Sequence, residues 1–338
     1  PFVDVQLVNG MSLGGSGDAG VRGDTYTLTP TYSRGAVNLL RSLRPSCYAE
    51  SSQDNATVTY VLGDGTMPIA ADFIALFGTN YRTATMEFNT SDSWASPAAS
   101  VTMDATLYAS TVLASPGGMV TLVGAAMIPH TYRSTPNRKF YLALKATNTE
   151  VYEILDNDDR AIYVTGLTTG YVGESAIVFG DRMMALMPSQ SRMYARLNIG
   201  AQQTASNTYV TGTPWLGLRH PISILYDNGF VDSWEPNATE WSTDAGLRQA
   251  ARRGGETHKR RIAWSTIDRL TTDYVVRLMA MLRRLDGTVQ PIAYCMDPDD
   301  VRTLGLYTIE GPPTTENSYG EHRTAFERVS QLILTEYR

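Results

Sequence analysis

The sequence contains little cysteine or histidine, and neither residue stands at a spacing that holds a metal. Two cysteines occur in 338 residues, Cys47 and Cys295, and they lie far apart without a CxxC pair. The four histidines are scattered singly, at His130, His220, His258 and His322. Zinc sites need ligands at short spacings, so only long-range assembly would create one here. We therefore expect two buried thiols rather than a structural disulfide, and no metal or cofactor.

Catalytic motifs are also missing. No GxSxG nucleophile elbow occurs, and the GGSG stretch at 14–17 lacks the Gly-Lys-Ser/Thr ending of a phosphate-binding loop. Asp156, Asp158 and Asp159 have the oxygen density of a calcium loop but not its spacing. Because aspartate and asparagine favour turns, we predict a turn at this cluster and another at 297–300. The chain is predicted to have no catalytic residues.

The chain has no excess of positive charge and no long apolar run. It carries 28 Lys and Arg against 34 Asp and Glu, a net charge of −6, whereas nucleic-acid-binding domains are usually basic. No stretch approaches the roughly 18 apolar residues that cross a bilayer, and residues 1–4 lack the features of a signal peptide. We expect a protein made in the cytoplasm, with neither nucleic acid nor a membrane as its partner.

What the sequence does contain is a long series of short β-strand patterns. After a first strand at 3–8, residues 9–24 are glycine-rich and polar, which predicts a flexible arm within 1–25. From 26 to 200, runs of β-branched, aromatic and aliphatic residues alternate with turn residues; examples are 56–62, 73–77, 139–144 and 161–166. The unbroken apolar run at 73–77 predicts a strand buried on both faces. The whole pattern is typical of an antiparallel β-sandwich or jelly roll.

The remainder of the chain has a different pattern. Residues 201–214 are small and polar, which predicts a linker. Residues 266–285 repeat apolar residues at spacings of three and four and end in two arginines, which predicts one amphipathic helix. Strands are predicted around it at 259–265, 289–296 and 328–335. The expected fold class is therefore mainly β, with a jelly roll at 26–200 and a smaller α+β domain at 215–338 that has one main helix against a sheet.

One segment, 248–261, concentrates positive charge. Its basic residues, set against the single Glu256, are Arg248, Arg252, Arg253, Lys259, Arg260 and Arg261. Such a cluster can neutralise a nucleic-acid backbone or bind an acidic surface on a neighbouring subunit. Aromatic residues for base stacking are missing between the charges, which favours the second interpretation. We therefore predict these six residues as a subunit interface.

Four stretches between 35 and 185 resemble one known family. They are ADFIALFGTN at 71–80, WASP at 94–97, RKFYLAL at 138–144 and IYVTGL at 162–167. Together they resemble the strands and turns of discoidin-like, galactose-binding-like jelly rolls in virion proteins of tailed bacteriophages. The resemblance implies a jelly-roll fold and carries no catalytic residues.

The C-terminal part resembles the minor tail and distal tail proteins of the same viruses. The order is a basic strand, HKRRIAWSTID at 258–268, a helix, QPIAYCMDPDD at 290–300, and a last strand, ERVSQLILTE at 327–336. The resemblance implies a structural subunit of the tail tip or baseplate, located in the virion and assembled in the host cytoplasm. Its implied partners are other tail proteins and further copies of the chain in a trimer or hexamer.

Two alternative functions remain beside the structural one. A carbohydrate-binding module would stack loop aromatics on a host-surface glycan, and the candidates are Tyr81, Trp94 and Tyr132. The competing interpretation is that these three aromatics pack the interior of the sandwich. A hydrolase acting on host envelope polysaccharide is the third hypothesis, although no motif in the sequence supports it.

Overall fold

Strands make up most of the structure. The computed structural model describes residues 2–7, 26–29, 48–51, 56–61, 68–123, 132–135, 138–145, 150–158, 160–167, 170–206, 208–212, 214–222, 230–235, 238–242, 248–252, 257–263, 291–295, 297, 299–310, 315–319, 325–329 and 331–336. Within these ranges the one helical element is the short 3-10 turn η1 (Val301–Thr303). The prediction of a mainly β protein is confirmed, while the helix predicted at 266–285 lies outside the described residues.

The chain forms two compact units, which interleave in sequence. The smaller unit consists of Pro1–Gln6, His220–Met296 and Gly305–Arg338, and the larger unit of Leu7–Arg219 and Asp297–Leu304. The chain therefore leaves the smaller unit after Met296, contributes eight residues to the larger one and then returns. Residues 201–214, predicted as a linker, lie within the larger unit, where β16 (Tyr209–Gly212) pairs with β3 (Tyr48–Ser51).

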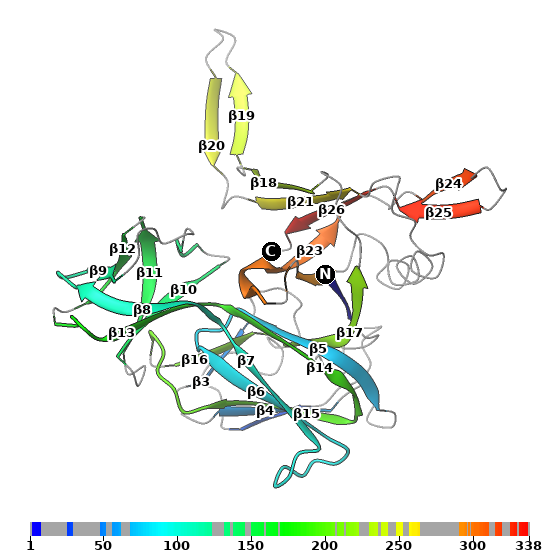
Figure 1. Cartoon of the computed structure of the whole chain (residues 1–338), viewed down its shortest axis with the longest axis horizontal. Coiled ribbons are helices and arrows are strands. Elements are labelled where there is room, and N and C mark those ends of the chain that lie inside the picture. Colours follow the sequence, from blue (N-terminus) through cyan, green and yellow to red (C-terminus); the bar gives the residue numbers. More distant parts are fainter. Residues whose placement is uncertain are drawn as a thin grey trace. The chain divides into compact units, whose positions relative to one another are not determined.

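A closed barrel forms one part of the larger unit (Figure 1). Its strands are β8 (Thr106–Ala114), β9 (Met119–Leu122), β10 (Phe140–Leu144), β11 (Glu150–Asn157), β12 (Ala161–Val164) and β13 (Ser175–Gly180). They close in the order β10-β11-β12-β9-β8-β13, and each neighbouring pair is antiparallel. Side chains such as Leu142, Ile154 and Val178 fill the interior with no exposed surface. Closure leaves the barrel without free strand edges.

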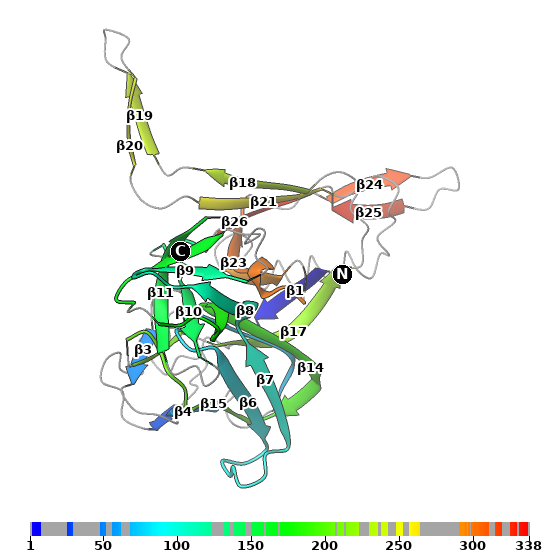
Figure 2. The ribbon, with the colours of Figure 1, turned by 60° about the vertical axis from the view of Figure 1, so that its left-hand side comes forward.

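A five-stranded sheet forms another part of the larger unit (Figure 2). In spatial order its strands are β2 (Tyr26–Thr29), β4 (Ala56–Val61), β15 (Tyr194–Gly200), β6 (Thr83–Asn89) and β7 (Ala99–Asp104). Burial alternates residue by residue along β6 and β15, as expected for strands with one face on the core. The buried face contributes Met86, Phe88 and Leu197 to the hydrophobic core. The opposite face is accessible to solvent.

The strand predicted to be buried on both faces is present as β5 (Ile69–Phe77). It pairs with β14 (Arg182–Arg192) on one side and with β17 (Pro214–Ile222) on the other. Residues 73–76 have no exposed surface, and Phe77 packs edge to face against the buried Trp215 at 6.3 Å between ring centroids. The apolar run is thus confirmed as a central strand.

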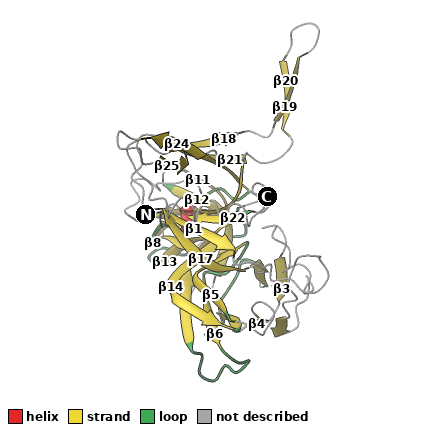
Figure 3. Cartoon of the chain, turned by 90° about the vertical axis from the view of Figure 1, so that its right-hand side faces the viewer, coloured by secondary structure: helices red, strands yellow, loops and turns green. Residues whose placement is uncertain are grey.

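The smaller unit contains a sheet and two hairpins. The sheet strands are β1 (Phe2–Leu7), β22 (Ile292–Cys295), β23 (Leu304–Ile309), β26 (Gln331–Glu336), β21 (Thr257–Ala263) and β18 (Phe230–Glu235), in that order. The strands predicted at 259–265 and 289–296 correspond to β21 and β22, whereas the stretch predicted as one strand at 328–335 covers the end of β25 (Ala325–Val329) and most of β26. The hairpins are β19 (Ala238–Ser242) with β20 (Arg248–Arg252), and β24 (Thr315–Tyr319) with β25 (Ala325–Val329) (Figure 3). Neither hairpin pairs with a third described strand. Cys295 is buried, and Cys47 lies outside the described residues.

The barrel passes into two neighbouring sheets through one-residue junctions, and a buried charged pair stands at one of them. A single residue, Asp181, separates β13 from β14, and only Ala105 separates β7 from β8. Asp181 is 5% exposed, and its Oδ2 accepts a hydrogen bond from the Lys139 backbone N at 2.9 Å. Burial raises the pKa of this carboxyl, and the neighbouring Arg182 offsets part of the rise. The Arg182 Nε lies 3.6 Å from Asp181 Oδ1.

Removing the arginine of this pair should destabilise the larger unit. Arg182→Met leaves the Asp181 carboxyl buried without its nearest cation, and we expect a loss of about 3–5 kcal/mol in the free energy of unfolding. The double variant Asp181→Asn with Arg182→Met should recover a large part of it. Arg219→Met is the control, because Arg219 is 40% exposed in its pair with Asp72, and we expect about 0–1 kcal/mol. Urea unfolding measures all three. Equal losses for Arg182→Met and Arg219→Met would contradict the role of the buried pair.

Candidate functional site

Two of the three aromatics predicted to contact a glycan are buried. Tyr81 is 0% exposed, and its hydroxyl donates to Thr211 Oγ1 at 3.3 Å. Tyr132 is 1% exposed and packs against Phe140 at 5.6 Å between ring centroids. Neither ring offers a face to a ligand, so both residues are core residues, as the competing interpretation held. Trp94 alone among the three is partly exposed.

Trp94 lies in the loop that joins β6 to β7, which extends beyond the ends of both strands (Figure 1). Its Nε1 donates to Asp92 Oδ1 at 2.7 Å. The guanidinium carbon of Arg196 lies 4.8 Å from the centre of the ring, which is cation–π geometry. Glu87 in turn holds Arg196, whose Nε donates to Glu87 Oε2 at 2.7 Å. The ring is therefore fixed at its edge and over one face.

The barrel carries most of the exposed large apolar side chains. Among the described residues these are Leu113, Val123, Leu155, Tyr163, Val172 and Leu218, and all but Leu218 lie in barrel strands or in the connections beside them. Val172 is 67% exposed and Leu113 is 56% exposed. We call Leu113, Val123 and Val172 the barrel patch. Backbone hydrogen bonds from Val123 N to Thr111 O and from Gly173 N to Val112 O place its two valines on either side of β8.

Two of these exposed leucines occupy strand irregularities. The register of β8 against β9 shifts between Val112 and Ala114, so Leu113 has no partner position. The register of β11 against β12 shifts in the same way at Leu155. A β-bulge redirects a side chain that would otherwise follow the strict alternation. The bulges thus place leucines on the outside of the barrel.

A polar cluster closes one end of the barrel. Glu150, at the start of β11, accepts hydrogen bonds from the Lys145 ammonium and from the hydroxyls of Tyr152 and Tyr171. The two tyrosine hydroxyls lie 3.2 Å apart. Lys145 has φ of 76°, a left-handed conformation that a residue with a side chain adopts rarely. The strained residue is held by its ion pair with Glu150, and the cluster ties the β10–β11 connection to the segment before β13.

The charge state of the cluster follows from these contacts. The Lys145 hydrogen bond, followed by that of Tyr171, lowers the pKa of Glu150 from 4.5 to about 2. The same contact with Glu150 raises the pKa of Lys145. Burial, followed by the hydrogen bond with Tyr171, raises the pKa of Tyr152. At neutral pH the cluster therefore contains a carboxylate, an ammonium and a neutral phenol at Tyr152.

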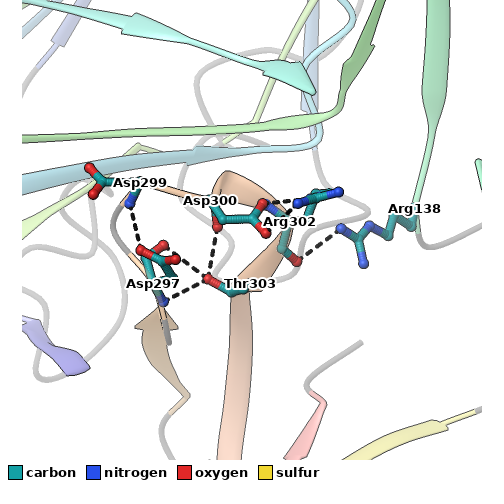
Figure 4. Close-up of polar contacts among 6 residues, drawn as sticks. All are labelled: Arg138, Asp297, Asp299, Asp300, Arg302 and Thr303. Atoms are coloured by element: carbon teal, nitrogen blue, oxygen red, sulfur yellow. Dashed lines mark hydrogen bonds and ion pairs between the residues drawn. The ribbon is translucent and has the colours of Figure 1, made fainter. Parts of the chain in front are cut away.

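The segment Asp297–Leu304, which we call the tether, is held in the larger unit by Arg138 and Arg182. Figure 4 shows the contact of Arg138 and the contacts within the tether. Arg138 Nη2 donates to the Arg302 carbonyl at 3.1 Å, and Arg182 Nη1 donates to the Leu304 carbonyl at 2.9 Å. Within the tether, Asp300 caps η1 by accepting from Arg302 N at 3.0 Å and also binds the Arg302 guanidinium through both carboxylate oxygens. Asp297 Oδ1 accepts from Asp299 N at 3.0 Å.

These contacts confirm the turn predicted at 297–300. The other predicted turn is present as well, because Asp158 Oδ1 accepts from the backbone N of Arg160 and of Ala161, at 2.8 and 2.7 Å. In both places an aspartate side chain accepts hydrogen bonds from backbone N–H groups two or three residues later in the chain, which is how aspartate stabilises a turn.

The predicted basic interface residues lie mainly in strands. Arg248 and Arg252 are the end residues of β20, and Lys259, Arg260 and Arg261 lie in β21, which pairs with β18 and β26. Lys259 Nζ lies 3.3 Å from Glu310 Oε2. Arg253 lies outside the described residues. The segment is therefore not one continuous arm, since its second half belongs to an inner strand of a sheet.

No cluster of three or more His, Cys, Asp or Glu able to hold a metal occurs in the described part of the chain. None of the described helical segments has the length and apolarity to span a membrane. Comparison with family models, with curated proteins and with solved structures finds no match.

The Glu150 cluster should make the stability of the folded protein depend on pH. Because the folded pKa of Glu150 is lowered, its contribution is present above the unfolded pKa and is lost as pH falls towards the folded value. We expect the urea midpoint of the wild type to exceed that of Glu150→Gln at neutral pH, and the difference to shrink between about pH 5 and pH 2. Glu153→Gln is the control, since among the described residues Glu153 pairs with Lys139 and is 36% exposed. A pH-independent difference for Glu150→Gln would contradict the assignment.

Proposed function

We propose that the protein is a structural subunit that assembles with further copies of itself. The observation that carries the proposal is the barrel patch, with Leu155 and Tyr163 on neighbouring strands of the same barrel. Solvent-exposed apolar groups that gather in one region mark protein interaction sites more often than scattered ones do. Their removal from water on association supplies the driving force for binding.

Two further features support an assembly role. Hairpins β19–β20 and β24–β25 pair with no third described strand, and isolated two-stranded hairpins are marginally stable in water unless other structure covers them. Arg248 and Arg252, predicted as interface residues, are part of one of these hairpins. The apolar patch and the hairpin would each contact a different surface of a neighbouring copy. Such head-to-tail contacts form a ring when they close around an axis, and the sequence resemblance implies a trimer or hexamer.

The setting that we propose is the tail tip or baseplate of a tailed bacteriophage, beside other tail proteins. This part of the proposal rests on the sequence resemblance of residues 35–185 and of the C-terminal part. The β-rich architecture is compatible with it and does not distinguish it from other structural roles.

Light scattering of the purified protein tests self-association. We expect a discrete oligomer for the wild type and a lower mass for Leu113→Ser combined with Val172→Ser, because both changes remove apolar area from the interface. Leu218→Ser, which removes an exposed leucine outside the barrel, is the matched control and should keep the wild-type mass. A wild-type monomer at every concentration would refute self-assembly, and an unchanged mass for the double variant would refute the barrel patch as its interface.

The viral setting has its own test. Mass spectrometry of purified particles of the virus that encodes the chain should detect it in several copies per particle. Its absence from the particles would refute the tail assignment, whatever the oligomeric state of the isolated protein.

A further inference from the structure

Strand β7 is an outer strand of the five-stranded sheet and lacks the features that usually protect such an edge. It pairs with β6 on one side, and among the described strands none pairs with its other side. Natural edge strands are commonly short, bulged, interrupted by proline or charged along their length, because their unpaired N–H and C=O groups invite another strand. Strand β7 has six residues, no proline and a register without a shift, and its one charged residue, Asp104, comes last.

The other outer strands of the larger unit differ from β7 in this respect. Strand β2, at the opposite edge of the same sheet, has only four residues. Strand β14, at the edge of the sheet that contains β5, has a register shift between Leu186 and Gln190 and includes Pro188. Regular length and register are thus retained at β7, where they leave an edge suited to accept a further strand.

The register against β6 fixes which backbone groups of β7 face outwards. Just past the end of the strand, Ala105 N donates to the Arg82 carbonyl at 2.9 Å. In an antiparallel strand every second residue bonds the same neighbour, so the odd-numbered residues of β7 bond to β6. The N–H and C=O groups of Ser100 and Thr102 therefore point away from β6. Beyond them the edge ends at the barrel, where Gly180 N donates to the Ala105 carbonyl.

The side chains of β7 are polar on one face and apolar on the other. Ser100 and Thr102 are exposed on the solvent face of the sheet. On the core side Met103 has no exposed surface, whereas Ala99 and Val101 pack against the core and remain partly exposed. The apolar side is thus incompletely covered along this edge, and an added strand would complete its burial.

From this geometry we propose that β7 pairs with β7 of a second copy of the chain, antiparallel and about a two-fold axis at Val101. Ser100 of each copy then lies opposite Thr102 of the other. Each such pair exchanges both of its backbone hydrogen bonds and brings two hydroxyl groups together. On the core side, Val101 meets its own counterpart and Ala99 meets Met103 of the second copy. The two five-stranded sheets would become one continuous sheet.

The strand is complementary to itself, which is the reason to assign a second copy as its partner. In the two-fold pairing hydroxyl side chains lie opposite hydroxyls, and apolar side chains lie opposite apolar ones. Asp104 lies opposite Ala98 of the second copy, so the two carboxylates do not meet across the interface. The proposal rests on the assembly role proposed above and adds to it a symmetric contact that uses no residue of the barrel patch.

Disulfide cross-linking between copies tests the pairing and its register. In Val101→Cys the two introduced cysteines face each other at a pair without backbone hydrogen bonds, where Cα atoms lie about 4.5 Å apart, within disulfide range. In the matched control Ala99→Cys they are four positions apart along the strands, roughly 13 Å, which is out of range. After mild oxidation we expect about tenfold more cross-linked dimer for Val101→Cys than for Ala99→Cys on a non-reducing gel. The oxidised wild type controls for the native cysteines, of which Cys295 is buried.

A second variant blocks the edge without touching the pairing of β7 with β6. Thr102→Pro removes an N–H that faces outwards, so the bonds to β6 remain while the strand can no longer pair fully on its free side. We expect light scattering to give half the wild-type mass for Thr102→Pro, and the wild-type mass for Thr102→Ala, which keeps the N–H group. Unchanged far-UV circular dichroism of Thr102→Pro would show that the fold is retained.

The edge contact and the barrel patch can be separated by combining variants. Val101→Cys should still cross-link when Leu113→Ser and Val172→Ser are also present, because neither of these residues lies in β7. Cross-linking that is lost only in this combination would assign self-association to the barrel patch alone and overturn the edge contact. The edge contact is equally overturned if Val101→Cys gives no more dimer than Ala99→Cys, or if a folded Thr102→Pro keeps the wild-type mass.

Discussion

The buried pair of Asp181 and Arg182 is the contact on which the larger unit depends. Asp181 stands where a barrel strand becomes a sheet strand, and Gly180 N donates to the carbonyl of Ala105 at the neighbouring crossing from β7 to β8. Arg182 reaches from the same point to the tether carbonyl of Leu304 and lies over the ring of Phe77 at 5.9 Å. One guanidinium therefore contacts the junction, the central strand β5 and the tether. A buried cation with these partners connects the barrel to the sheet strands β14 and β5 and to the tether, and a relative shift would leave a charged group unpaired.

The larger unit presents two surfaces of opposite character. The barrel has no edge strands to offer, so contacts with other proteins must use its outer side chains, and the bulges at Leu113 and Leu155 supply apolar ones. The sheet retains the alternation of core and solvent faces without interruption along β6 and β15, and its solvent face is polar. The exposed leucines of the barrel thus stand where its strands bulge, whereas the polar face of the sheet lies on strands in which buried and exposed residues alternate regularly.

The sequence predicts the local elements better than their assembly. The strand at 73–77 and the turns at Asp158 and Asp300 were predictable from local sequence. An apolar run marks a buried strand, and an aspartate side chain bonds backbone N–H groups close to it in the chain. Closure of the barrel depends on which strands pair, which no local pattern encodes. Tyr81 and Trp94 illustrate the same limit for the site: both follow turn residues, yet Tyr81 is buried beneath Thr211 whereas Trp94 remains accessible over Arg196. The cluster around Glu150 had no sequence signal, because Lys145 and Tyr171 reach it only through the barrel.

The tether shows how a short segment can be held firmly with few demands on its sequence. Arg138 and Arg182 bind the carbonyl oxygens of Arg302 and Leu304, and these contacts depend on the path of the backbone rather than on the side chains. The path itself is set inside the tether, where Asp297 and Asp300 bond the backbone amides ahead of them. Thr303 also sets this path, because its hydroxyl accepts from Asp297 N at 2.9 Å and donates to the carbonyl of Asp300 at 2.8 Å. Loss of Asp300 would remove the cap of η1 and the partner of the Arg302 guanidinium together. The information that positions this segment therefore resides in two aspartates and one threonine within it, and in two arginines far from it in sequence.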